Sequence, residues 1–165
     1  MSNPGDGASA VVAGRLTVGA EAPAFTLDDE AGAPVSLSDF GGRPVLVYFY
    51  PKADSAACTT QACGLRDILG DIGDTAVVGI SPDPPDKQAR FAQRYGLGFP
   101  LLCDADHLVA EAYGVWVRRS INGRPFMGVE RAAFLVDGDR TLRDVWYRVS
   151  PKDTPKLVLK SVTGS

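Results

Sequence analysis

VLVYFYPKADSAACTTQAC, residues 45–63, carries the clearest structural signals in this chain. It begins with an apolar, aromatic run that Pro51 ends, a pattern typical of a strand buried on both faces. A short polar loop follows, and from Cys58 to about Leu69 small and apolar residues recur at helical spacing until Gly70. The segment therefore predicts a strand, a loop and a helix that begins near Cys58. A thiol at a helix N-terminus lies beside free backbone N–H groups and the positive end of the helix dipole, which favour the reactive thiolate.

The rest of the chain alternates predicted strands and helices. Strands are expected at 22–29, 34–40, 75–81, 99–104, 131–137 and 141–149, and helices at 81–96, 107–114 and 154–162. The last two strands alternate across a GDR turn, which indicates an antiparallel hairpin. Thr154 and Pro155 are expected to act as N-cap and first-turn residue of the final helix. This pattern predicts an α/β fold with a central mixed β-sheet flanked by helices and with short N-terminal strands.

Composition restricts the function classes. The chain has 165 residues, 45% of them hydrophobic and 22% charged, with a formal net charge of −3. These values are typical of a globular protein and do not favour nucleic acid or membranes as partners. The Gly-, Ala- and Ser-rich residues 1–14 predict a flexible tail, and residues 15–165 a single domain. Three cysteines without a secretion signal favour the cytoplasm, and no Cys/His group has zinc spacing, so neither a metal nor a cofactor is expected.

Residues 51–63, PKADSAACTTQAC, resemble the active-site segment of peroxiredoxins, specifically the Q type or bacterioferritin comigratory protein family. The family pattern is Pro, three residues, Thr or Ser, two residues, and then the Cys that attacks peroxide. Pro51, Ser55 and Cys58 fill it. The segments LVYFYP, YGLGFPLLCDAD, AYGVW, MGVERAAFLVD and VSPKDTPKLVLKSV also occur in the family order. The resemblance implies a thioredoxin-like fold and thiol-dependent reduction of hydroperoxides.

The resemblance also implies roles for individual residues. It makes Cys58 the peroxidatic and Cys63 the resolving cysteine, with Pro51 shielding the thiol from water. Ser55 either donates its hydroxyl to the peroxide or serves as a plain helix N-cap. Ionising most of a thiol at neutral pH takes about 3.4 kcal/mol, of which a helix N-terminus supplies up to roughly 2. A charge-assisted hydrogen bond adds roughly 1.5–3 kcal/mol, so a cation is required, and the resemblance assigns that part to Arg131.

The spacing of Cys58 and Cys63 has a mechanical consequence. An offset of five helical residues places the two Cα atoms about 8–9 Å apart, beyond the usual disulfide limit of about 6.8 Å. A disulfide between them therefore requires the first helical turn to unwind. The alternative role for Cys63 is that of a small apolar core residue of the helix.

Some positions depart from the family pattern or lie outside it. Relatives usually carry Thr, Pro and Gly where this chain has SAA at 55–57. Gln61 stands where a Glu usually helps to orient the arginine, and it keeps the hydrogen-bonding capacity without the charge. Cys103 is expected to pack as an inert thiol, and His107 to lie at the surface.

The sequence thus predicts an atypical two-cysteine peroxiredoxin that reduces hydrogen peroxide and organic hydroperoxides. Thioredoxin or a similar dithiol would recycle it, and the protein would be a monomer or weak homodimer. One alternative is a protein disulfide oxidoreductase or thiol redox sensor on the same fold, which would normally show a two-residue gap between its cysteines. A non-catalytic binding module is the other, and the joint presence of Pro51, Ser55, Cys58 and Arg131 argues against it.

Overall fold

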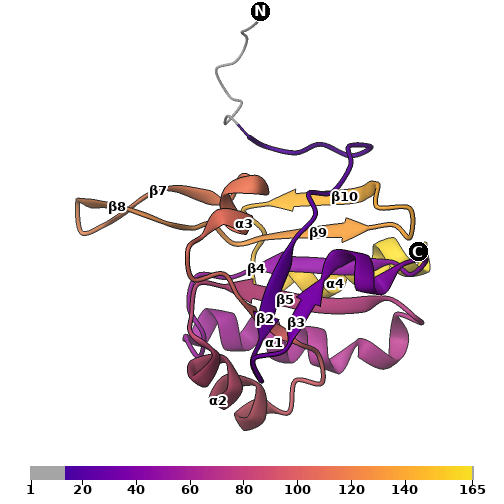
Figure 1. Ribbon diagram of the computed structural model, residues 1–165, viewed down its shortest axis with the longest axis horizontal. Helices are drawn as coiled ribbons and strands as arrows, with labels where there is room; N and C mark the ends of the chain where they lie inside the picture. The colour runs from indigo at the N-terminus through magenta and orange to yellow at the C-terminus, as the bar shows by residue number, and fades with distance from the viewer. Residues whose placement is uncertain (1–13, 165) are drawn as a thin grey trace, which may run out of the picture.

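A seven-stranded mixed β-sheet forms the centre of the computed structural model, which describes residues 14–164 (Figure 1). Its strands are β2 (Thr26–Asp29), β3 (Pro34–Ser36), β4 (Val45–Phe49), β5 (Ala76–Ser81), β6 (Leu101–Cys103), β9 (Ala132–Val136) and β10 (Leu142–Tyr147). They lie in the order β10-β9-β4-β5-β6-β2-β3. Strands β4, β5 and β6 are parallel, and the outer pairings are antiparallel. The expected fold, a mixed sheet flanked by helices, is confirmed.

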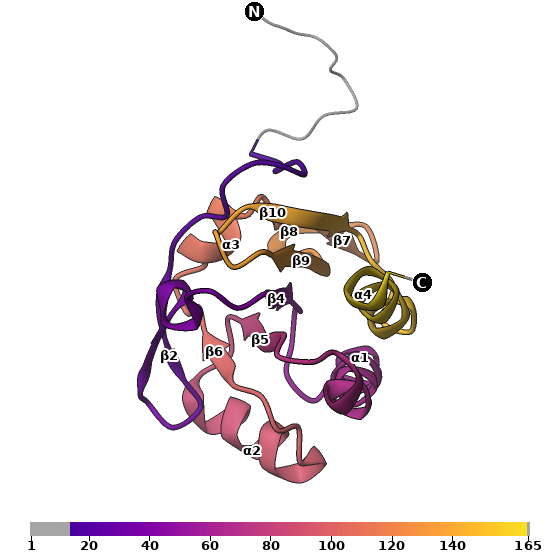
Figure 2. The same ribbon diagram turned by 90° about the vertical axis from the view of Figure 1, so that its right-hand side faces the viewer.

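The helices cover both faces of the sheet. They are α1 (Ala56–Asp67), α2 (Pro85–Tyr95), α3 (Leu108–Ala112) and α4 (Asp153–Thr163), with short 3-10 turns η1 (Leu37–Phe40) and η2 (Leu69–Asp71). All of β4 is buried, as predicted, and its successive side chains point to opposite faces. Leu46 and Tyr48 pack with residues of α1, α2 and α4, whereas Val47 and Phe49 pack with residues of α3. Figure 2 shows α3 on the other side of the sheet from α1 and α4.

Helices α1 and α4 lie side by side against the same part of the sheet (Figure 2). The contact depends on Gly64, because a Cβ there would lie 2.6 Å from the Cγ of Pro155. The absence of a side chain at Gly64 thus lets the start of α4 approach the helix that carries Cys58.

Two local predictions were wrong in detail. The strand expected at 34–40 ends at Ser36, because the Asp39 carboxylate accepts the Ser36 N–H at 2.8 Å and favours the helical turn η1. Helix α4 begins at Asp153, whose N–H donates to the Ser150 hydroxyl at 3.0 Å. Thr154 is therefore a buried residue inside the helix rather than its N-cap.

The structure adds a hairpin that the sequence analysis missed. Strands β7 (Trp116–Ile121) and β8 (Arg124–Val129) form a separate two-stranded antiparallel sheet that projects from the main body (Figure 1). Asn122 and Gly123 make its turn with φ angles of 52° and 78°. Asn-Gly between two extended runs is a strong hairpin signal, so the sequence contained the information for this element.

The flexible tail predicted for residues 1–14 lies, up to residue 13, outside the described residues, and a single domain over 15–165 stays a prediction. Within residues 14–164 no helix has the length and apolar character that crossing a membrane would require.

Candidate active site

Cys58 lies in the first turn of α1 and is 1% exposed. Ser55 precedes the helix in an extended conformation, and its hydroxyl oxygen accepts the Cys58 N–H at 3.3 Å. The same hydroxyl donates to the Lys52 carbonyl at 3.1 Å. Ser55 is thus the N-cap of α1, and the cap places the thiol beside the unpaired N–H groups of the helix start.

Arg131 contacts the thiol from the segment between β8 and β9. Its Nη2 donates to the Cys58 Sγ at 3.4 Å, and its Nη1 donates to the Gln61 Oε1 at 2.7 Å. The guanidinium therefore bridges a sulfur and an amide that lie one helical turn apart on α1. A cation and a helix N-terminus meet at this one thiol.

A chain of hydrogen bonds determines how Gln61 is oriented. Its Nε2 donates to the Thr154 Oγ1 at 2.9 Å, and the Thr154 hydroxyl donates to the Ser150 carbonyl at 2.7 Å. Thr154 has one hydroxyl hydrogen, so its oxygen accepts from Gln61. The amide nitrogen of Gln61 faces α4, which turns its oxygen toward Arg131. Both Gln61 and Thr154 are fully buried.

All three cysteines are free thiols. Cys63 is half-buried and lies on α1 together with Cys58, so both residues are helical in this state. Within residues 14–164, no cluster of three or more His, Cys, Asp or Glu side chains is arranged to hold a metal ion.

A family model described as "AhpC/TSA family" matches residues 18–145. The putative peroxiredoxin bcp of Haemophilus influenzae is 47% identical over 146 residues, which cover 87% of this chain and 94% of the relative. The chain belongs to the AhpC/TSA family, among its Bcp or Q-type peroxiredoxins.

Further relatives and solved structures support the same family membership. Peroxiredoxin Bcp of Escherichia coli is 47% identical over 133 residues, or 79% of this chain and 85% of the relative. The crystal structure of peroxidoxin BcpB from Mycobacterium tuberculosis superposes with a TM-score of 0.81 at 34% identity, covering 91% of this chain and 98% of that one. A peroxiredoxin Q structure from Xanthomonas campestris gives 0.80 at 25% identity over 85% and 90% of the two chains. The fold is that of the thioredoxin-like peroxiredoxins, and the protein is a thiol peroxidase.

The peroxiredoxin loop before Cys58 is anchored by residues that the sequence analysis missed. Asp83, just beyond β5, accepts the Ala53 N–H at 2.6 Å and the Ser81 hydroxyl at 2.7 Å. Asp54 adopts a φ of +66° and pairs with Arg94 at 3.2 Å. Nothing local in the sequence marks Asp83, because its partner lies 30 residues earlier in the chain.

Tyr48 places an unsatisfied hydroxyl close to the peroxiredoxin thiol. The side chain is fully buried, and its hydroxyl has no hydrogen-bond partner within the described part of the chain. Burial, and next the charge of Cys58, raises the pKa of Tyr48 far above its ordinary value. The ring lies against Gly79, where a Cβ would come within 2.9 Å of it.

Cys103 has a different environment at the end of β6. Burial raises the pKa of its thiol to about 11, and the carboxylates of Asp28 and Glu30 add to the effect. Its thiol is therefore protonated at neutral pH. His107, expected at the surface, is partly exposed: its ring stacks on Trp116 at 3.9 Å and its Nδ1 pairs with Glu111 at 2.6 Å.

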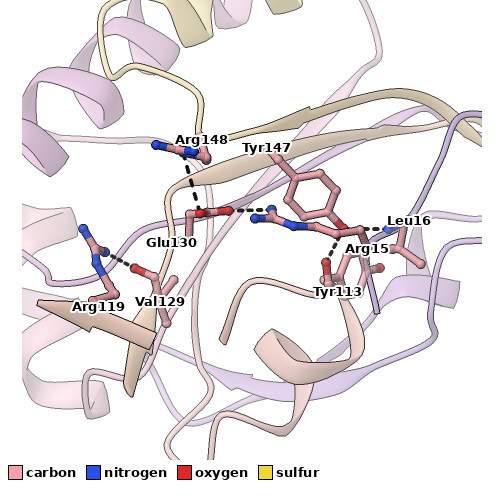
Figure 3. A network of polar contacts seen from close by, with 8 residues as sticks. All are labelled: Arg15, Leu16, Tyr113, Arg119, Val129, Glu130, Tyr147 and Arg148. Atoms are coloured by element: carbon pink, nitrogen blue, oxygen red, sulfur yellow. Dashed lines mark hydrogen bonds and ion pairs between the residues drawn. The ribbon is translucent and has the colours of Figure 1, made fainter. Parts of the chain in front are cut away.

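The residue before Arg131 is held by a polar network of its own (Figure 3). The Glu130 carboxylate pairs with Arg15 at 2.5 Å and with Arg148 at 4.0 Å. The Arg15 guanidinium lies 4.0 Å from the centre of the Tyr147 ring. These contacts of the Glu130 side chain connect Arg15 and the end of β10 to the segment between β8 and β9 that carries Arg131.

An apolar groove of about 440 Å³ separates the peroxiredoxin loop from the β7–β8 hairpin. Pro51 lines it on one side, and Trp116, Phe126 and Met127 line it from the hairpin. The missed hairpin thus forms one wall of a groove beside the loop that precedes Cys58.

Proposed function

We propose that this peroxiredoxin reduces hydrogen peroxide and organic hydroperoxides through Cys58. The Cys58 thiolate attacks the terminal peroxide oxygen, the O–O bond breaks, and the departing oxygen takes a proton to leave as water or an alcohol. Cys58 becomes a sulfenic acid. The contact of the Arg131 Nη2 with the Cys58 Sγ at 3.4 Å carries the proposal, because it pairs a fixed cation with a thiol at a helix N-terminus.

Arg131 has a second task in this reaction. Its charge also stabilises the negative oxygen that forms as the O–O bond breaks. Gln61 supports this role by holding Nη1, which leaves Nη2 directed at the sulfur. Pro51 shields the thiol from water. The Ser55 hydroxyl gives its hydrogen to the Lys52 carbonyl, so Ser55 contributes as the N-cap that positions Cys58.

Cys63 then resolves the sulfenic acid. Its thiolate attacks the Cys58 sulfur, the sulfenic oxygen leaves as water, and an intramolecular disulfide forms. Both residues lie within α1, and five helical residues span about 8–9 Å between Cα atoms. The first turn of α1 must therefore unwind, which breaks the contact between Cys58 and Arg131. Thioredoxin or a similar dithiol in the cytoplasm reduces the disulfide and restores the helix.

The apolar groove beside Pro51 supports the acceptance of organic hydroperoxides. Hydrogen peroxide has no apolar part, whereas an alkyl group gains free energy when it leaves water for such a surface. Pro51 and Lys52, in the loop that precedes Cys58, line the groove, so an alkyl chain in it would lie beside that loop.

Counting thiols after mixing the reduced protein with one equivalent of hydrogen peroxide tests the proposal. The wild-type chain should lose two thiols within one molecule, and Cys103→Ser should lose two as well. Cys58→Ser should lose none. Peroxide consumption by Cys58→Ser would contradict the assignment, and a protein that exchanges with disulfides but ignores peroxide would be a disulfide oxidoreductase.

A further inference from the structure

A second hollow next to the active site has an unusual charge. It measures about 670 Å³ and reaches the β7–β8 hairpin and Arg131. Its lining holds five arginines against one carboxylate, namely Arg15, Arg118, Arg119, Arg131, Arg148 and Glu130. The chain as a whole carries a net charge of −3. Positive charge is thus concentrated beside the reactive thiol of an otherwise acidic molecule.

Part of this charge has no internal counter-charge. Glu130 pairs with Arg15 and Arg148, whereas Arg119 donates to the Val129 carbonyl. Arg118 is exposed and has no ion-pair partner among residues 14–164. A guanidinium group without a counter-charge is suited to bind a carboxylate, because its planar fork of N–H donors fits the two carboxylate oxygens.

The same hairpin presents large apolar side chains to solvent. Ile121, Phe126 and Met127 are 62%, 40% and 50% exposed. Arg118 is paired across the hairpin with Met127, and Arg119 with Phe126, so each face combines an arginine with an apolar side chain. Aromatic, methionine and arginine side chains are enriched at protein interfaces, and a small anion would not use the apolar ones.

We propose that this hairpin and the arginine hollow dock an acidic dithiol protein that reduces the oxidised enzyme. The inference rests on the proposed function, which requires such a partner at Cys58, and Arg131 links the hollow to that cysteine. A second copy of this chain fits less well, because a symmetric contact would bring two arginine clusters together.

Reduction of the peroxide-oxidised protein, followed by stopped flow, tests the docking site. The reductants are a purified acidic thioredoxin and the uncharged dithiothreitol. For Arg118→Glu we expect the second-order rate constant with thioredoxin to fall about tenfold, since charge steering changes association rates by roughly 10- to 1,000-fold. For Arg118→Gln the rate constant with thioredoxin should fall less, and neither variant should change the rate constant with dithiothreitol. Salt should slow the reaction of the wild-type protein with thioredoxin and leave its reaction with dithiothreitol unchanged.

Lys160→Glu is the matched control, because it makes the same change of charge at an exposed residue of α4, outside the hairpin and the lining of the hollow. An equal loss in Lys160→Glu, an equal loss with dithiothreitol, or no salt dependence would overturn the docking site. Peroxide turnover with dithiothreitol would in each case leave the proposed function intact. Conversion of a dimer into a monomer by Arg118→Glu in sedimentation velocity would make a second copy the occupant instead. Failure of peroxide to form any disulfide would overturn the proposed function and the docking site together.

Discussion

The Gln61 side-chain amide donates to the Thr154 hydroxyl at 2.9 Å, and this bond joins the helix of Cys58 to the C-terminal helix. The two residues are 93 positions apart in the chain. Because Thr154 gives its own proton to Ser150, the bond has one possible direction, and it points the Gln61 oxygen at Arg131. A glutamate at position 61 would hold the arginine by charge. In this chain the Thr154 hydroxyl on α4 orients Gln61, and Gln61 in turn holds Arg131 by a hydrogen bond.

Thr154→Val should therefore weaken both the fold and the peroxide reaction. The substitution keeps the shape but leaves the buried Gln61 Nε2 without an acceptor, which costs about 1–3 kcal/mol. Urea unfolding should show this loss, and the second-order rate constant with hydrogen peroxide should fall severalfold as Gln61 releases Arg131. Thr154→Ser keeps the hydroxyl and serves as the control. If the Val and Ser variants react with peroxide equally fast, Thr154 has no part in orienting Gln61.

Arg131→Met should slow the reaction of Cys58 with peroxide. The substitution removes the charge-assisted hydrogen bond to the Cys58 Sγ and the cation that stabilises the departing oxygen, so the second-order rate constant with hydrogen peroxide should fall about tenfold or more in stopped flow. Arg124→Met, on the exposed hairpin, removes the same charge at a distance and should leave the rate constant unchanged. An unchanged rate constant in Arg131→Met would remove Arg131 from the reaction.

Oxidation should join Cys58 to Cys63 within one chain and melt the first turn of α1. Mass spectrometry of the peroxide-treated, non-reduced protein should find a monomer-sized species with both cysteines in one disulfide-linked peptide. Hydrogen exchange at residues 55–65 should accelerate, while β4 stays protected because it is buried on both faces. A disulfide between Cys58 and Cys103, or between two chains, would mean that Cys63 is only a packing residue.

Tyr48→Phe and Tyr50→Phe should have opposite effects on stability. The Tyr48 hydroxyl has no partner in the described structure, so its removal should leave the free energy of unfolding unchanged or raise it. The buried Tyr50 hydroxyl donates to the Gln88 Oε1 at 2.5 Å, so its removal should cost about 1–3 kcal/mol. Urea denaturation of both variants makes the comparison, and a marked loss in Tyr48→Phe would reveal a partner for that hydroxyl.

Cys103 should react only at high pH. Its pKa of about 11 means that the protonated, unreactive thiol dominates below that pH. In a Cys58→Ser, Cys63→Ser chain, the alkylation rate should rise about tenfold per pH unit up to pH 10, without the plateau near pH 8.5 of an ordinary thiol. A reference cysteine peptide measured alongside provides that plateau. Fast alkylation at pH 7 would show that the site opens to solvent.

The local structure around Cys58 followed from the sequence alone, because each signal acts over a few residues. The apolar run of β4 is stopped at Pro51, Ser55 caps α1, and helical spacing continues to the end of α1. The Asn-Gly signal for the turn at Asn122 and Gly123 was equally local, so the hairpin was also predictable from the sequence. Gln61 and Arg131 were placed near the cysteine by family resemblance, since no local pattern links positions 70 residues apart.

Only the tertiary structure decided which distant groups complete the site. Thr154 and Pro155 carry a local pattern typical of a helix start, yet the close approach of Pro155 to Gly64 buries Thr154 against Gln61. Asp83 reaches the active-site loop because β4 and β5 are parallel neighbours, and their carboxyl ends meet at one edge of the sheet. Hydrophobic periodicity determines which face of an element is buried. The packing of whole elements determines which polar atoms meet there, and it depends on the shapes of both surfaces at once.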